Sequence, residues 1–205
     1  RAQIEPDLEP EITISTVDLQ ISKRDEMRLV YVPAGDFLMG SDDEYGHPGD
    51  SPMHSIFLDA FWIDQTEVTN SQYQQCVAAG ACEPPSDFSY FKREKYFGND
   101  VFQDYPVAFV SWHQANDYCQ WAGRRLPTEA EWEKAARGEN GQEYPWGTEQ
   151  PNNELLNFKG SAGQKNPLEG TTKVGSYPQG ASPYGALDMA GNVSEWVADW
   201  YDLSY

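Results

Sequence analysis

The chain is organised around residues 123–138, which read GRRLPTEAEWEKAARG. Thr128 can accept a hydrogen bond from the amide of Glu131, whose side chain can reach back to the amide of Thr128; this is the capping box that starts a helix. Pro127 separates this helix from any helix before it, and Gly138 offers a left-handed stop at its end. Three apolar residues recur on one face: Trp132, Ala135 and Ala136. The stretch predicts a short, well-capped helix that packs through this face.

Two further capping boxes predict two more helices. Thr69 with Gln72 opens a helix that we expect to stop at Gly80, and Ser111 with Gln114 opens one that we expect to stop just before the organising stretch. Residues 29–40 predict two strands joined by a turn at 33–35. Residues 56–63 are largely apolar on both faces, which predicts one strand buried on both sides. Residues 83–105 predict a long irregular loop held by aromatic side chains.

Composition favours a single loop-rich domain and excludes several kinds of partner. The chain has 205 residues with 17 Gly and 14 Pro, and regular patterns fade after residue 138, where residues 194–200 fit either a short helix or a strand. A formal net charge of -19 argues against nucleic acid and against an anionic membrane surface as partners. No apolar run reaches the length of a membrane span, so we expect a soluble protein, with the cytoplasm slightly favoured as its compartment.

Several ordered motifs resemble one family, the formylglycine-generating enzymes or sulfatase-modifying factors. The organising stretch matches the central motif of this family, and four other segments match in the same order: residues 32–40, 66–70, 144–147 and 184–196. The resemblance implies a mixed α/β, C-type-lectin-like fold, with short helices around an irregular antiparallel sheet. It covers residues 28–205. We interpret residues 1–27 as an acidic leader or linker with one potential edge strand; the alternative is a disordered linker from an upstream domain.

The best candidate for a metal site is the segment from Asp188 to Glu195. Two carboxylates flank a turn at residues 190–192 that allows backbone carbonyls to point inward, and calcium prefers such a mixture of oxygens. The alternative is a structural turn in which Glu195 caps backbone amides. The resemblance implies calcium bound by the side chains of Asp188 and Glu195 and by the carbonyls of Gly191 and Val193.

The resemblance implies a second calcium site, for which the spacing is less clear. Its ligands would be Asn157, Phe158, Asn166 and Leu168. A histidine site formed by the three histidines is also conceivable, but no carboxylate–histidine spacing supports it. These histidines are His47, His54 and His113.

The three cysteines do not form a catalytic pair. Cys76 and Cys82 are close enough in sequence to form a local disulfide, although Cys76 equally suits a small core position; Cys119 lies in a predicted helix. Formylglycine-generating enzymes oxidise a substrate cysteine with O2 and Cu(I) held by two cysteines near the C-terminus. None of the three cysteines matches that pair, so the chain contributes no catalytic residue, and copper is expected only if a further C-terminal segment carries the pair.

Two functions of different classes follow from these observations. The first is a formylglycine-generating oxidase whose C-terminal segment is absent from this chain. The second is a non-catalytic binding or scaffold module, for variable-ligand display or as part of a multidomain signalling protein; a structural domain stabilised by calcium is the plainest version. A protein or peptide partner is expected, including a second chain that completes the domain.

Overall fold

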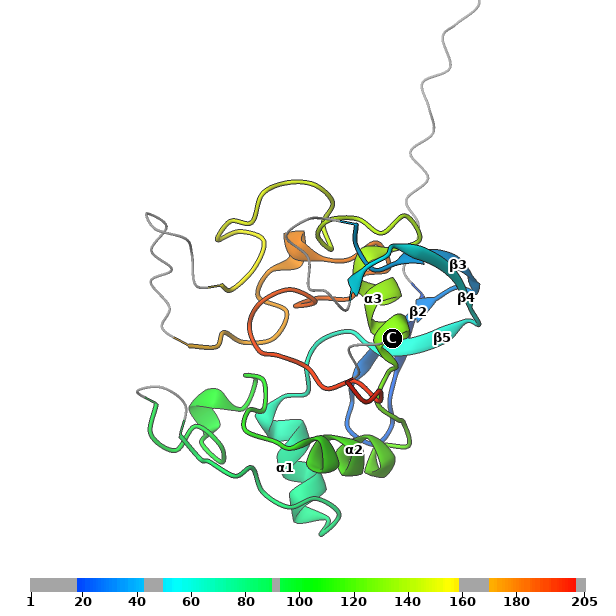
Figure 1. Ribbon diagram of the computed structural model, residues 1–205. Coiled ribbons are helices and arrows are strands. Elements are labelled where there is room, and N and C mark those ends of the chain that lie inside the picture. The colour runs from blue at the N-terminus through cyan, green and yellow to red at the C-terminus, as the bar shows by residue number, and fades with distance from the viewer. Residues whose placement is uncertain (1–17, 43–49, 90–92, 159–169, 202–205) are drawn as a thin grey trace, which may run out of the picture.

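The computed structural model describes residues 18–42, 50–89, 93–158 and 170–201 (Figure 1). The strands are β1 (Leu19–Ile21), β2 (Arg28–Val32), β3 (Gly35–Met39), β4 (His54–Leu58) and β5 (Phe61–Asp64). The helices are α1 (Asn70–Ala78), α2 (Trp112–Trp121) and α3 (Glu129–Arg137), with short 3-10 turns η2 (Asp100–Phe102) and η3 (Pro178–Gly180). The fold is therefore mixed α/β and loop-rich, as predicted.

The strands form two small antiparallel sheets. One sheet has the order β1-β2-β5, and the other pairs β3 with β4. The predicted turn at 33–35 is present, but β2 and β3 do not pair with each other: each pairs with a strand further along the chain. β1 lies at the edge of the first sheet, and its three residues are exposed.

Helix α3 forms as its sequence predicts and packs against both sheets. The capping box of Thr128 and Glu131 is present, and the chain leaves the helix at Gly138 with φ of 69°. Its apolar face meets β2 in a core made by Val30, Val32, Ala135, Ala136, Ala186 and Met189. Lys134 is buried in the same helix and donates hydrogen bonds to the carbonyls of Pro33 and Gly35, at 2.9 and 2.8 Å. The helix therefore fixes the turn between the two sheets.

Helices α1 and α2 form a second core at the other end of the molecule (Figure 1). Their predicted capping boxes are both present. The rings of Tyr73 and Tyr118 stack between them at a centroid distance of 5.7 Å. Part of the long irregular loop closes this core through Phe97, and Tyr96 beside it is fully buried.

Two sequence predictions about strands and chain end were wrong. Residues 56–63 do not form one strand buried on both sides: the chain breaks between β4 and β5, and Phe57 and Trp62 expose 62% and 41% of their surface. Apolar residues on both faces predict two buried faces, but β4 and β5 belong to different sheets, and the side chains of Phe57 and Trp62 remain exposed. Residues 194–200 form neither a helix nor a strand.

The C-terminal part of the described chain crosses between the two cores. Ala198 donates its amide to the carbonyl of Pro127 at 2.8 Å, and the indole of Trp112 donates to the carbonyl of Val197 at 2.8 Å. This segment, red in Figure 1, therefore lies against both α2 and the start of α3. It carries the predicted metal-binding loop into the centre of the molecule.

Candidate functional site

The loop from Asp188 to Glu195 has the tight backbone that the sequence predicts. Asp188, Gly191 and Asn192 all adopt positive φ values, of 57°, 86° and 54°. At Gly191 only glycine fits, because a Cβ atom there would lie 2.3 Å from the carbonyl oxygen of Asn157. The loop thus folds back on itself against Asn157.

The two predicted carboxylate ligands lie at the ends of this loop in different surroundings. Asp188 is buried, and its Oδ2 accepts a 2.5 Å hydrogen bond from the amide of Gly175. Glu195 is exposed as a whole residue, but its Oε2 accepts a 3.0 Å hydrogen bond from the indole of Trp132 and it lines an internal cavity. Withdrawal of this carboxyl group from water raises the pKa of Glu195 to about 7, although the Trp132 bond opposes the rise.

A third carboxylate, Glu67, joins them and was missed by the sequence analysis. It lies between β5 and α1, is more than nine-tenths buried, and no N–H or alcohol group of the described residues donates to either of its oxygens. Burial first, and then repulsion from Asp188 and Glu195, raise the pKa of Glu67 well above its ordinary value. The side chain of Asn192 lowers the pKa of Glu67 and so offsets part of this rise. It does not, however, form a hydrogen bond of normal geometry with either carboxylate oxygen of Glu67.

A signal for Glu67 was present in the sequence. It belongs to residues 66–70, one of the segments that carry the family resemblance, and it stands directly beside the apolar Val68. A carboxylate held next to the core at the start of a capped helix needs a partner. Its partner could not be named, because Asp188 lies more than a hundred residues further along the chain.

The loop fits a hard cation such as calcium. It combines the carboxylates of Asp188 and Glu195 with the carbonyls of Gly191 and Val193, which accept no hydrogen bond from any described residue. Side chains alone do not make such a site: in the described part of the chain, no group of three or more His, Cys, Asp or Glu residues is arranged to hold a metal ion. The predicted backbone carbonyls are therefore essential to this interpretation.

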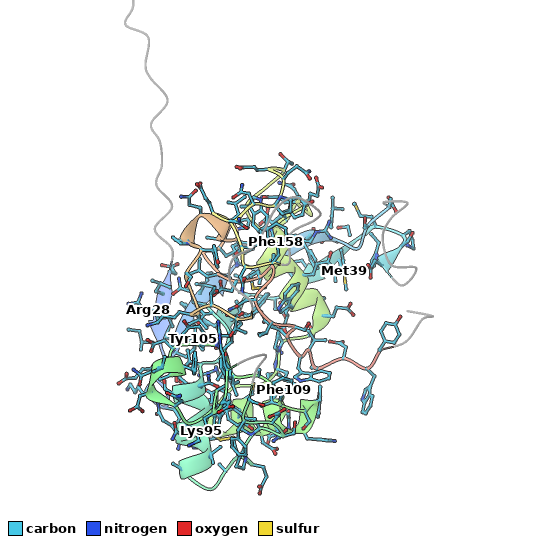
Figure 2. All side chains as sticks on the ribbon, turned by 90° about the vertical axis from the view of Figure 1, so that its left-hand side faces the viewer. Arg28, Met39, Lys95, Tyr105, Phe109 and Phe158 are labelled. Carbon is cyan, nitrogen blue, oxygen red and sulfur yellow. A yellow bond between two sulfur atoms is a disulfide. The ribbon has the colours of Figure 1, made fainter. Side chains whose placement is uncertain are left out.

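The structure describes only two of the four residues of the predicted second metal site, Asn157 and Phe158. Asn166 and Leu168 lie outside the described residues. Asn157 is buried, and its side-chain amide donates to the carbonyl of Gly170 at 2.9 Å and to Oδ1 of Asn192 at 3.1 Å. Asn157 and Phe158 line a groove of about 600 Å³ with the Gly191–Val193 turn and Phe109; Figure 2 labels Phe109 and Phe158.

A cavity of about 390 Å³ lies between β5, α2, α3 and the Asp188–Glu195 loop. All four residues of β5 line it, and most of its wall is apolar. Acidic groups face it as well, namely Asp64, Glu67, Glu131 and Glu195.

Arg124 connects this wall to the N-terminal part of the domain. Its guanidinium donates to both carboxylate oxygens of Asp25, at 2.6 and 3.1 Å, and its Nε lies 3.1 Å from Asp64. Asp25 is fully buried and also accepts a 2.6 Å hydrogen bond from the hydroxyl of Tyr118. One arginine thus joins the turn after β1 to the end of β5.

The cysteines do not fit a Cu(I) centre. Cys76 and Cys82 are joined by a disulfide, with their Cα atoms 5.3 Å apart. Cys119 is the remaining free cysteine of the chain, and burial raises the pKa of its thiol to about 12, so it is not a thiolate at neutral pH. The chain therefore offers no pair of thiolates for copper.

The predicted histidine site has no support among the described residues. His54 lies in β4, with its Nδ1 2.9 Å from the carbonyl of Pro52, and His113 lies in α2. His47 lies outside the described residues. In the same part of the chain, no helix is long and apolar enough to cross a membrane.

Comparisons with known proteins agree with the motifs. The chain is 37% identical over 188 residues to the serine/threonine-protein kinase pkn1 of Chlamydia caviae; the match covers 86% of this chain but only 28% of the kinase. It is 33% identical to the inactive C-alpha-formylglycine-generating enzyme 2 of Mus musculus, over 92% of this chain and 74% of that protein.

A solved structure and a family model complete the comparison. The structure of PvdO from Pseudomonas aeruginosa superposes with a TM-score of 0.71 at 29% identity, over 91% of this chain and 76% of PvdO. The model of the sulfatase-modifying factor enzyme 1-like domain matches residues 17–205. The chain therefore belongs to the sulfatase-modifying factor enzyme 1-like domain family, and proteins similar to it include the formylglycine-generating enzyme of Bos taurus, 30% identical over 87% of this chain and 59% of that protein.

Proposed function

We propose that this domain is a calcium-binding module that binds an extended polypeptide segment along β5. The observation that carries the proposal is the 390 Å³ cavity, which all four residues of β5 line. Among the described strands, β5 has a neighbour on one side only. A free strand edge beside an apolar cavity suits the addition of a partner strand, whose backbone pairs with the edge while alternate side chains enter the cavity.

The charge of the cavity indicates what kind of segment it binds. The cavity is mostly apolar, and four carboxylates face it against two arginines, Arg124 and Arg125, which pair with Asp64 and Glu131. Glu67 and Glu195 have no such ion pair among the described residues, and the chain carries a formal charge of -19. Electrostatic complementarity favours a segment whose apolar residues alternate with Lys or Arg. Exposed indoles at Trp62 and Trp196 offer aromatic surface of the kind that dominates binding interfaces.

Calcium would support this surface by fixing the loop that forms one of its walls. Asp188 and Glu195 would bind through their side chains, and Gly191 and Val193 through their carbonyls. The cation would offset the charge of the buried carboxylates. The loop residues Val193, Ser194 and Trp196 line the cavity, so a fixed loop presents a fixed wall to the partner.

The calcium proposal is tested by thermal unfolding. After treatment with a chelator, added calcium should raise the melting temperature, because a ligand that binds only the folded state stabilises it. Asp188→Ala should abolish the rise. An equal rise in this variant would contradict the assigned ligands.

The polypeptide proposal is tested with peptides selected from a random display library on the calcium-loaded protein. We expect selected peptides to alternate apolar and basic residues and to change the fluorescence of Trp132 and Trp196, which line the cavity. Ala115→Trp, which fills the cavity from α2, should abolish binding. The control Val101→Trp alters an exposed position outside the cavity and should not. Selected peptides that bind Ala115→Trp as tightly as the unaltered protein would overturn the proposal.

Copper-dependent oxidation of a substrate cysteine is the second candidate, and membership of the family favours it. Two observations rank it below the binding module. The chain's own cysteines offer no thiolate pair, and the similar mouse protein is named as inactive. The expected result is no O2 consumption above the copper-free control when copper and a cysteine-containing peptide are supplied. Copper-dependent consumption would favour the oxidase.

A further inference from the structure

The two faces of β5 present different side chains to the cavity. Side chains alternate along a strand, so Trp62 and Asp64 lie on one face of β5, and Phe61 and Ile63 lie on the other. We propose that Trp62 recognises an arginine of the bound segment, whose guanidinium stacks on the indole. The inference rests on the polypeptide binding proposed above and names the side chain that this strand edge selects.

The backbone of Trp62 and Asp64 points to the free edge of β5. The amide of Gln65 donates to the carbonyl of Arg28 at 2.7 Å, which makes these two residues a hydrogen-bonded pair of the β2–β5 ladder. Such pairs alternate along an antiparallel ladder, so Ile63 also bonds to β2, whereas Trp62 and Asp64 direct their N–H and C=O groups away from it. A partner strand would bond to these two residues, and the side chains directly opposite them would lie on their face.

The other face of β5 favours apolar residues of the partner. Phe61 and Ile63 pack against the core between β2 and α3, beside the ring of Trp132. Partner side chains on this face would meet apolar surface, where an unpaired charge is costly to bury. Basic residues of an alternating segment therefore belong on the face of Trp62.

The ring of Trp62 is held in place for a flat cation. Tyr31 of β2 lies directly opposite it in the ladder, and the two ring centroids are 5.2 Å apart. The two residues still expose 41% and 36% of their surface. Tyr31 supports the indole from the β2 side, which leaves the side toward the free edge for a partner. Arginine suits this position because its planar guanidinium both stacks on an indole and carries a charge.

The charge beside Trp62 also favours a cation. Asp64 lies on the same face, two residues along the strand, and shares Arg124 with Asp25. Burial raises the pKa of Asp64 to about 6 against the opposing effect of Arg124, so Asp64 is ionised at neutral pH. Two carboxylates and one guanidinium leave one net negative charge here. This charge does not depend on calcium, because none of the three groups belongs to the calcium loop.

Arginines of the chain itself make this kind of contact elsewhere. The guanidinium carbon of Arg24 lies 5.6 Å from the ring centroid of Trp121, and Arg93 stacks on two further rings. In the part of the chain that the structure describes, no Lys or Arg stacks on Tyr31 or Trp62. This ring pair is therefore open to a cation from a partner.

A double-mutant cycle tests the contact with a peptide selected on the calcium-loaded protein. Each arginine of the peptide is replaced in turn by citrulline, which is planar like arginine but uncharged. Fluorescence anisotropy of the labelled peptide gives its affinity for the unaltered protein and for Trp62→Leu. The control Phe57→Leu removes an exposed ring of β4 that does not line the cavity. NMR of the peptide bound to the unaltered protein gives a second readout that needs no variant.

We expect one arginine of the peptide to lose about 5-fold or more in affinity on replacement by citrulline, and less than about 2-fold when the protein is Trp62→Leu. Phe57→Leu should show the same loss as the unaltered protein. The side-chain protons next to this guanidinium should shift upfield on binding, because a ring stacked on them shields them.

The outcomes separate this inference from the proposal on which it rests. Selected peptides without arginine, or an equal loss with the unaltered protein and Trp62→Leu, would overturn the role of Trp62 while leaving the docking of a segment on β5 intact. If no selected peptide required the cavity, as judged with Ala115→Trp, the proposed function would fail and this inference with it.

Discussion

The indole N–H of Trp132 in α3 donates a 3.0 Å hydrogen bond to the carboxylate of Glu195, at the end of the predicted metal-binding loop. The helix that organises the sequence thus also orients one ligand of the candidate site. Trp132 packs against the core between β2 and α3, so its ring is held in place from behind. The bond connects the packing of the domain to its candidate chemistry.

Trp132→Phe should keep most of this packing and remove the donor. We expect the pKa of Glu195 to rise further above about 7, because the Trp132 bond opposes the rise, and the free energy of unfolding to fall by about 1 kcal/mol. NMR titration of the carboxyl group and urea unfolding measure the two effects. The control Trp146→Phe loses an indole hydrogen bond to the carbonyl of Glu149 at an exposed site and should change neither the Glu195 titration nor stability as much. Equal effects in both variants would disprove the special role of Trp132.

The buried pair of Arg124 and Asp25 should make stability depend on acid. Burial alone would raise the pKa of Asp25, but hydrogen bonds from Arg124, Ser22 and Tyr118 outweigh it and lower the pKa from 3.8 to about 2. Between about pH 4 and pH 2 the unfolded chain therefore binds more protons at Asp25 than the folded protein does. The contribution of this carboxylate, about 2 kcal/mol, is fully present above pH 4 and is lost as the pH falls to 2.

Urea unfolding across this pH range checks the prediction against Asp25→Asn. The variant should lose about 3 kcal/mol or more at pH 7, because Arg124 is left without its closest partner, and its stability should fall less steeply between pH 4 and pH 2. A slope equal to that of the unaltered protein would assign the acid sensitivity to other groups.

Gly191→Ala should lower the free energy of unfolding much more than the same change at Gly98. Both residues have positive φ, of 86° and 77°, so both substitutions strain the backbone by about 1 kcal/mol. Only at Gly191 does the added Cβ atom meet a neighbour, the carbonyl of Asn157 at 2.3 Å. We therefore expect a loss of about 2 kcal/mol or more at Gly191 and about 1 kcal/mol at Gly98, measured by urea unfolding. Similar losses at both positions would show that the loop moves away from Asn157 without cost.

The disulfide should contribute measurably despite the short loop that it closes. Cys76 and Cys82 are six positions apart, for which the chain-entropy model gives about 2 kcal/mol. We expect the double variant Cys76→Ala, Cys82→Ala to lose about that amount in unfolding without reductant. Cys119→Ala is the control for loss of a buried sulfur: it keeps the bridge, so reductant should destabilise it as it does the unaltered protein, whereas the double variant should be insensitive to reductant. If reductant destabilised the double variant as much as the unaltered protein, the bridge would not be the source of the effect.

The parts of the fold that were predicted correctly depend on neighbours in sequence. Each capping box joins residues three positions apart, so Thr69, Ser111 and Thr128 could be assigned without knowledge of the fold. Strand pairing depends on distant partners. The pattern around Phe57 indicated a strand but could not show that the chain divides between two sheets and leaves that side chain exposed.

In the candidate site, too, the features set by neighbouring residues could be predicted, and those set by distant residues could not. The loop from Asp188 to Glu195 supplies its own turn and two carboxylates, so a metal site could be predicted there. Glu67 comes from a segment that only the fold brings against that loop, through the hydrogen bond between Gln65 and Leu187. The proximity of Glu67 to this loop could therefore not be predicted from the sequence, although the motif around it was recognised.

The position of Arg124 has a mechanical consequence. One guanidinium holds Asp25, directly after the edge strand β1, and Asp64, in the wall of the cavity. Tension applied to the chain ahead of β1 would therefore reach β5, the strand on which we expect a partner to dock, through this side chain as well as through the hydrogen bonds of the β1-β2-β5 sheet. Arg124 thus couples the N-terminal end of the domain to the strand edge that we propose as its binding edge, so that a pull on one should alter the other.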